Sequence, residues 1–291
     1  MILVTGANGN LGSATLAALR ARGAVATGGS RTPDEGMRRL DFDDHGGLDL
    51  AGVSTLVLIS AGYAEDDQVV GRHAAVLEAA VRDGVRHVVY TSLTGAGDHL
   101  GFALAHRATE RLVRTSGLPW TILRNGLYAE LFGGLLIWAG SGVESAFGDG
   151  ALAAVAREDL ADAAAIVAAN PTQHSGRVYD LVGTPITARQ VADRLGVPHH
   201  TISLAEYRRR LLHETPGLLP FQSPMLASIA TGIRHGFLDG TAPGLTDLLD
   251  RPARDALATA AAAATATRPE ASTSARTSGL SESGSGPWPD S

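Results

Sequence analysis

Short apolar runs alternate with longer segments of helical periodicity through the first half of the chain. This alternation is typical of βαβ units, in which helices cover a parallel sheet. The expected strands are residues 2–5, 24–27, 39–42, 55–59, 87–90 and 120–123. The pattern therefore predicts an α/β fold built on a doubly wound parallel sheet.

Between these strands, apolar residues recur at three- and four-residue spacing, as they do in helices that cover a sheet. The expected helices span residues 11–22, 66–83 and 103–116. Each is followed by a glycine, namely Gly23, Gly84 and Gly117, where helices often end in a left-handed residue. This repeated punctuation supports the three helix assignments.

The pattern loosens beyond residue 124. We expect helices at 127–138, 159–169 and 187–195 and strands at 151–156 and 178–182. Helical stretches then alternate with turns, which indicates a smaller, mostly helical C-terminal lobe over the carboxyl ends of the strands. The prediction is one dinucleotide-binding domain, 1–266, with a substrate lobe built from about 126–150 and 183–258, and a disordered tail, 267–291, rich in Ser, Thr, Gly and Pro.

A glycine-rich loop joins the first strand to the first helix. Gly6 permits a tight exit from the strand, Gly9 lets the backbone approach a pyrophosphate, and Gly12 lets the helix pack closely on the sheet. The helix N-terminus adds N–H donors and a positive dipole end. This setting predicts a Rossmann-type phosphate loop, with an unliganded glycine-rich turn as the alternative. The residues expected to bind the cofactor are Gly6, Ala7, Asn8, Gly9, Asn10, Leu11 and Gly12.

The end of the second strand distinguishes NADPH from NADH. NAD-binding proteins place a carboxylate there for the ribose 2′-hydroxyl, whereas this chain has Arg31, whose planar donor fork suits a 2′-phosphate. NADPH is therefore favoured, and NADH becomes the alternative if Asp34 or Glu35 turns inward. Asp41 and Phe42 are expected beside the adenine, although Asp41 could instead cap the next segment.

Composition excludes several other chemistries. A net charge of −6 and a pI near 5.9 argue against nucleic-acid binding. The chain has no cysteine and no lysine, which removes disulfides, thiolate nucleophiles, Schiff bases and a Walker-type phosphate site. His199 and His200 lack partners at metal-ligand spacing, so we expect no metal. Neither a signal segment nor a membrane span is apparent, so a cytoplasmic location is expected.

In open parallel sheets, ligands bind beyond the carboxyl ends of the strands. We expect further cofactor contacts there, and residues 124–128 at the nicotinamide end. Short-chain dehydrogenases carry a tyrosine followed four residues later by a lysine, a pair that moves the substrate proton. Tyr90 is followed instead by Thr94, so that pair is absent. The expected contacts are Ile59, Ser60, Ala61, Tyr90, Thr91 and Ser92.

Several motifs together resemble the NmrA-like, atypical short-chain dehydrogenase/reductase family, and within it the bacterial NADPH:quinone oxidoreductases of the second type. The resemblance covers roughly residues 1–260, and its most specific block is GLPWTILRNGLY at 117–128. The plant reductase branch has a lysine where this chain has Phe102, which argues against that branch. The other matching segments are TGANGNLG at 5–12, SR at 30–31, DFD at 41–43, YTSL at 90–93 and HRATE at 106–110.

The resemblance implies hydride transfer from NADPH to a quinone held between the two lobes. A reduced quinone oxygen is phenol-like, with a pKa of about 10, so little general acid help is needed. Tyr128, Asn125 and His106 are candidate catalytic residues. Their alternatives are a substrate wall for Tyr128, a turn former for Asn125, and for His106 an i, i+4 pair with Glu110 on the helix surface.

Two other functions remain open at this point. The missing Tyr/Lys pair and the NmrA branch are compatible with a non-catalytic NAD(P)-sensing regulator of a protein partner. An enzyme acting on a nucleotide-linked sugar or an isoflavone-like aromatic is disfavoured by the missing lysine. The expected partner is a small quinone-like molecule, with no nucleic acid and no membrane. The sequence also leaves a homo-oligomer open.

Overall fold

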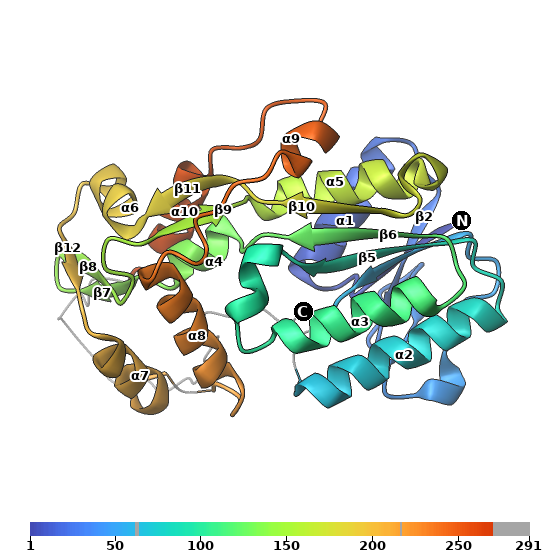
Figure 1. The fold of residues 1–291 in the computed structure, drawn as a ribbon, viewed down its shortest axis with the longest axis horizontal. Helices are drawn as coiled ribbons and strands as arrows, with labels where there is room; N and C mark the ends of the chain where they lie inside the picture. The colour runs from blue at the N-terminus through green and yellow to red at the C-terminus, as the bar shows by residue number, and fades with distance from the viewer. Residues whose placement is uncertain (62–63, 216, 270–291) are drawn as a thin grey trace, which may run out of the picture.

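The computed structural model describes residues 1–61, 64–215 and 217–269. Its centre is a seven-stranded sheet in the order β10-β6-β5-β4-β1-β2-β3, and every neighbouring pair is parallel (Figure 1). The order reverses between β1 and β4, which creates a crevice at their carboxyl ends. The strands are β1 (Ile2–Thr5), β2 (Ala26–Ser30), β3 (Arg38–Arg39), β4 (Thr55–Ile59), β5 (His87–Leu93), β6 (Trp120–Asn125) and β10 (Arg177–Leu181).

Two helical layers cover this sheet (Figure 1). Leu56 and Leu58 of β4 pack in a cluster with α2 and α3, whereas Val57 packs in a cluster with α1 and α5. Alternate strand residues thus serve opposite layers, which explains why these strands are apolar throughout. The predicted fold class is confirmed. The layer helices are α1 (Asn10–Ala21), α2 (Asp66–Arg82), α3 (Ala103–Thr115) and α5 (Arg157–Ala169).

The predicted helix ends are also confirmed. Gly23, Gly84 and Gly117 have φ angles of 72°, 73° and 81°, and each lies two residues beyond the last residue of α1, α2 or α3. A side chain is disfavoured at such angles, so glycine is the residue that ends these helices at low energetic cost.

Two predicted strands need correction. The strand expected at 24–27 is shifted to Ala26–Ser30, because Gly28 and Gly29 continue it; a Cβ on Gly28 would lie 2.5 Å from the Cβ of Ala7, so the phosphate loop requires glycine there. The strand expected at 39–42 ends at Arg39. Asp41 instead forms a turn, in which its side chain accepts the N–H of Asp43 at 3.1 Å, and such turns compete with strands.

The second half of the chain adds a third hydrophobic cluster beside the sheet. The helix expected at 127–138 is wrong in its second half, because α4 ends at Gly134 and a hairpin follows. That hairpin and β12 form a three-stranded sheet that was not predicted. Further elements are α4 (Ala129–Gly134), β7 (Ile137–Ala139), β8 (Gly142–Ser145), β9 (Ala151–Ala154), β11 (Thr184–Thr187), α6 (Ala188–Leu195), β12 (His199–Thr201), α7 (Leu204–His213), α8 (Gln222–Arg234), α9 (Gly244–Leu248) and α10 (Ala256–Ala266), with 3₁₀ turns η1 (His45–Gly47), η2 (Gly95–His99) and η3 (Pro171–His174).

Helices predominate in this C-terminal region, as predicted. Apart from residues 267–269, the tail predicted at 267–291 lies outside the described residues. Over the part of the chain that is described, no helix combines the length and the hydropathy needed to cross a membrane.

Candidate functional site

A cleft of about 1140 Å³ lies at the carboxyl ends of β1, β2 and β4. Residues of the phosphate loop and of the loop after β2 form one end of it. Apolar residues of α4, α8 and α10, among them Leu131, Met225 and Ala263, form part of the other wall. The cleft therefore joins a polar end suited to a nucleotide to an apolar end suited to a flat organic acceptor.

Two glycines of the phosphate loop leave no room for another residue type, one because of its backbone angle and one because of crowding. Gly6 has a φ of 59°, and a Cβ on Gly12 would collide with the carbonyl oxygen of Gly6 and lie 2.7 Å from its carbon. Gly9 caps α1 without a side-chain acceptor, so the first-turn N–H groups have no partner within the helix. Asn10, Leu11 and Gly12 line the cleft at this point, which fits a bound pyrophosphate.

The loop after β2 is fixed against the phosphate loop. Asn8 Nδ2 donates to the carbonyl oxygen of Thr32 at 2.7 Å, and the carbonyl oxygen of Arg31 accepts from Arg39 Nη1 at 3.1 Å. Arg31 is exposed and lines the cleft, whereas Asp34 and Glu35 lie outside the lining residues. After β2, an arginine rather than a carboxylate therefore lines the cleft.

Asp41, Phe42 and Asp43 line the same end of the cleft. Arg72 of α2 donates to both carboxylate oxygens of Asp43, at 2.6 and 2.7 Å. The hydrogen bond from Arg72 lowers the pKa of Asp43, against the opposing effect of burial. This pair holds the turn after β3 against α2.

A buried histidine holds the end of β4. His73 Nε2 accepts the N–H of Ala61 at 2.9 Å, so Nδ1 carries the ring proton and donates to Thr109 Oγ1 at 2.8 Å. Burial lowers the pKa of His73 to about 3, which keeps the ring neutral. Ile59, Ser60 and Ala61 line the cleft beside it.

Tyr90, Thr91 and Ser92 lie beneath the cleft rather than on its surface. They are buried in β5 and absent from the lining residues. Thr91 Oγ1 accepts the N–H of Ser60 at 3.2 Å, and the hydroxyl of Tyr90 pairs with His106 Nδ1 at 3.1 Å. These residues therefore support the cleft wall from behind.

His106 projects from α3 into the lining of the cleft. Burial lowers its pKa to about 4, with a further contribution from Arg107, so the ring is neutral at pH 7. Burial also raises the pKa of Tyr90 far above its usual value. At pH 7 neither group of this pair therefore carries a proton that it readily donates.

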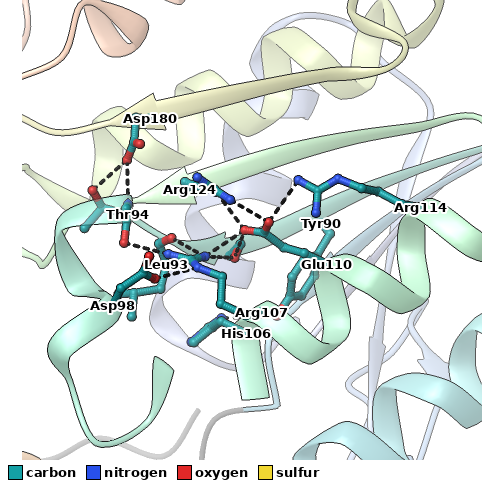
Figure 2. A network of polar contacts seen from close by, with 12 residues as sticks. Tyr90, Leu93, Thr94, Asp98, His106, Arg107, Glu110, Arg114, Arg124 and Asp180 are labelled. Atoms are coloured by element: carbon teal, nitrogen blue, oxygen red, sulfur yellow. Dashed lines mark hydrogen bonds and ion pairs between the residues drawn. The ribbon is translucent and has the colours of Figure 1, made fainter. Parts of the chain in front are cut away.

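Glu110 is the centre of a buried ionic network that sequence reasoning missed (Figure 2). The alternative interpretation of His106 and Glu110 as a pair on the helix surface is wrong, because the Glu110 side chain is only 1% exposed. It accepts from Arg124 Nε and Nη2, both at 2.8 Å, and from Ser92 Oγ at 2.7 Å. Burial alone would raise the pKa of Glu110, but the hydrogen bonds from Arg124 and Ser92 bring it down to about 2.

The network extends from Glu110 to the turn before α3. Arg107 Nη1 donates to Glu110 Oε1 at 2.8 Å, and its guanidinium also donates to the carbonyl oxygens of Leu93 and Thr94, each at 2.9 Å. Thr94 Oγ1 in turn donates to Asp180 of β10 at 2.6 Å (Figure 2). This network thus ties three strands and one helix together.

Tyr128 precedes α4 and lines the cleft, together with Glu130 and Arg157. The guanidinium of Arg157 lies 5.0 Å from the ring centroid of Tyr128. The carboxylate of Glu130 accepts the backbone N–H of Arg157, at 3.1 and 3.2 Å. Asn125 is buried at the end of β6, outside the lining, and its Oδ1 has no hydrogen-bond partner among the described residues.

A family model described as NAD(P)H-binding matches residues 6–171. The chain belongs to this NAD(P)H-binding family. Quinone oxidoreductase 2 of Escherichia coli is 33% identical over 280 residues, which cover 87% of this chain and 94% of that protein. The resemblance to NmrA-like quinone oxidoreductases expected from the sequence is confirmed.

Two solved structures resemble this NAD(P)H-binding protein over nearly their whole length. Triphenylmethane reductase of Citrobacter sp., complexed with NADP(H), has a TM-score of 0.78 and 30% identity, covering 90% of this chain and 99% of that one. The NADPH-dependent quinone oxidoreductase of Escherichia coli, complexed with NADPH, gives the same TM-score, identity and coverage.

In this NAD(P)H-binding protein, most of the residues singled out from the sequence come together in one cleft. Ala7, Tyr90, Thr91, Ser92 and Asn125 are the exceptions, since they lie behind its surface. Sequence reasoning missed Arg157, which stands far from Tyr128 in the chain and carries no motif of its own. No group of three or more His, Cys, Asp or Glu within the described ranges is arranged to hold a metal ion.

Proposed function

We propose that the protein is an NADPH-dependent oxidoreductase that transfers a hydride to a quinone or a related carbonyl acceptor. The observation that carries this proposal is the single cleft, in which the phosphate loop and Arg31 share one cavity with an apolar acceptor end. The reductases that match nearly the whole chain support it.

The cofactor contacts follow from the cleft. The first-turn N–H groups of α1 bind the pyrophosphate, Arg31 binds the 2′-phosphate, and Asp41 and Phe42 border the adenine. Ile59, Ser60 and Ala61 continue the wall toward the nicotinamide. NADPH supplies the hydride when it is bound, and the preference over NADH rests on Arg31.

The missing Tyr/Lys pair agrees with a quinone acceptor. A quinone that gains a hydride becomes a phenolate-like anion, which takes its proton from water. The protein must then mainly hold the acceptor against the cofactor. We assign the acceptor to the apolar end, between the sheet and a substrate lobe that includes α4 and α8. Tyr128 and His106 border it, and Asn125 supports this end from behind.

The regulator alternative has less support, because the matching proteins named above are enzymes. A small-molecule acceptor is therefore the partner we propose. A cytoplasmic location and a homo-oligomer stay predictions from the sequence.

A fluorescence titration with NADPH and then NADH, followed by a simple benzoquinone, tests this function. We expect tighter binding of NADPH than of NADH, and fast loss of NADPH fluorescence only when enzyme and quinone are both present. Tight NADPH binding without any quinone-dependent decay would contradict the enzymatic function and favour the regulator. Equal affinity for both nucleotides would contradict the role of Arg31.

A further inference from the structure

The cationic side chains that line the cleft differ in their partners. Arg31 lies at the adenine end and Arg72 is held by both carboxylate oxygens of Asp43. Arg157 lines the cleft beside Tyr128. Its backbone N–H donates to Glu130, but its guanidinium has no ion pair or hydrogen bond within the described ranges. A partly buried guanidinium with free donors is therefore available to an anionic group in the cleft.

The ring of Tyr128 and the N-terminus of α5 form the surroundings of this guanidinium. The ring of Tyr128 lies against it at 5.0 Å, and stacking of this kind leaves the N–H groups at the edge of the plane free to donate. Arg157 is also the first residue of α5, where the helix dipole is positive. The carboxylate of Glu130 is occupied by the backbone N–H of Arg157, so it caps the helix.

The position of Arg157 matches the place where charge develops in the proposed reaction. Tyr128 borders the acceptor end, and Leu131, one turn further along α4, is part of its apolar wall. Hydride addition moves two electrons onto the quinone, leaves a negative charge on its oxygen and converts NADPH to NADP⁺. His106 is neutral and the chain has no lysine, so Arg157 is the cation beside Tyr128 among the described residues that line the cleft.

We propose that Arg157 is a catalytic residue that donates hydrogen bonds to the acceptor oxygen and stabilises its negative charge as the hydride arrives, with Tyr128 as its positioning residue. This proposal rests on the proposed function. Charge stabilisation of this kind replaces the tyrosine and lysine of typical short-chain dehydrogenases, and a proton from water then completes the hydroquinone. The substrate class that fits is an uncharged quinone with one oxygen directed at the guanidinium.

The test compares the wild type with Arg157→Gln and Arg157→Lys on benzoquinones whose hydroquinones differ in acidity. We expect Arg157→Gln to lower kcat by about 100-fold for methyl-substituted benzoquinones and by only about 10-fold for tetrachlorobenzoquinone, because the more acidic product needs less stabilisation. Arg157→Lys, which keeps the charge but not the planar fork, should lie between the two. The matched control is Arg177→Gln, an exposed arginine of β10 outside the cleft.

The affinity for NADPH separates this role from cofactor binding. We expect the NADPH Kd of Arg157→Gln to stay within about twofold of the wild type. A Kd raised about tenfold with unchanged kcat at saturation would assign Arg157 to a cofactor phosphate and overturn the proposal. An equal loss of kcat for every acceptor would overturn it too, since a merely structural defect does not depend on product acidity. If the wild type reduces quinones and Arg157→Gln does so equally well, only the catalytic role of Arg157 is contradicted. If the wild type reduces no quinone, the proposed function is contradicted as well.

Discussion

The protein has no lysine, so all of its Lys and Arg positions are arginine. One consequence is the set of hydrogen bonds around Glu110. One buried carboxylate accepts hydrogen bonds from Arg107, Arg114 and Arg124. The planar fork of a guanidinium presents several donors in one plane, which allows the two oxygens of a single carboxylate to be shared. An ammonium group could not replace Arg124, whose Nε and Nη2 bond to different oxygens.

The proposed preference for NADPH over NADH rests on Arg31, so it is tested at that residue. We expect Arg31→Gln to raise the Kd for NADPH by about 10- to 100-fold, because hydrogen bonds to a charged group contribute about 1.5–3 kcal/mol. The Kd for NADH should change little, since it lacks the 2′-phosphate. Fluorescence titration measures both constants. Arg22→Gln, on the exposed end of α1, is the control, and a parallel loss of affinity for both nucleotides would contradict a role specific to the 2′-phosphate.

Tyr207 is a second residue whose substitution has a predictable sign. Its side chain is buried, with 3% exposure, and its hydroxyl has no hydrogen-bond partner among the described residues. Because a buried unpaired hydroxyl costs about 1–3 kcal/mol, Tyr207→Phe should raise the free energy of unfolding by about 1 kcal/mol.

Urea unfolding measures this change against a matched variant. Tyr179→Phe loses the hydrogen bond between the Tyr179 hydroxyl and His174, which is 2.8 Å long, and should lower the free energy of unfolding. A loss of stability in Tyr207→Phe as large as that in Tyr179→Phe would show that the Tyr207 hydroxyl is satisfied in solution.

Among the helices and strands, the pattern of apolar residues predicted those whose signals are continuous in the sequence and repeat along the chain. The strand-helix units ending at Gly23, Gly84 and Gly117 were predicted because each helix, its apolar face and its terminating glycine are continuous in the sequence. The hairpin of β7 and β8 was not, because strands of three and four residues are too short to show an alternating pattern. The strand that pairs with β8, β12, lies more than fifty residues further along the chain, where no local signal could connect the two.

Two glycines, one inside α2 and one just after it, test this explanation of the helix ends. Gly84 follows α2 with a φ of 73°, so Gly84→Ala should lower the free energy of unfolding by about 1–2 kcal/mol. Gly71 lies inside α2, and a Cβ there would meet nothing within 4 Å. Gly71→Ala should therefore raise stability by about 0.5–1 kcal/mol. Thermal and urea unfolding compare the two variants, and the same sign for both would contradict the conformational explanation.

At the scale of the whole molecule, the parts of the site that are contiguous in the sequence could be predicted, whereas the parts that depend on tertiary contacts could not. The phosphate loop was predictable because the residues that form it are consecutive in the sequence. The network of Ser92, Glu110 and Arg124 and the contact of Tyr128 with Arg157 join separate elements that meet only after folding. Asn125 was taken for a cleft residue because it ends a strand at the correct edge, yet its side chain is buried. Strand position predicts the edge of the sheet, whereas packing decides which side chains reach the ligand.

Buried neutral histidines should make the stability of the whole protein depend on pH. Burial lowers the pKa of His73 to about 3, and those of His87 and His106 to about 4. An unfolded histidine titrates near pH 6.5. Below that pH the unfolded chain binds protons that the folded protein does not, so stability is lost as the pH falls from about 6.5 toward 4. Glu110, with a pKa lowered to about 2, adds a further loss only below about pH 4.5, where an unfolded glutamate takes up its proton.

Urea unfolding at about pH 7, 6 and 5 measures this loss of stability. The loss approaches about 1.4 kcal/mol per pH unit for each histidine that is protonated in the unfolded chain but neutral in the folded protein. His73→Asn should lower stability at every pH, because the N–H of Ala61 loses its acceptor, but it should also flatten the pH dependence by about one proton. His200→Asn, at an exposed position, is the control for replacing a histidine by asparagine. If His73→Asn kept the wild-type slope, then His73 would be protonated in the folded protein, and its ring could not serve as the neutral acceptor that holds the end of β4 in the cleft.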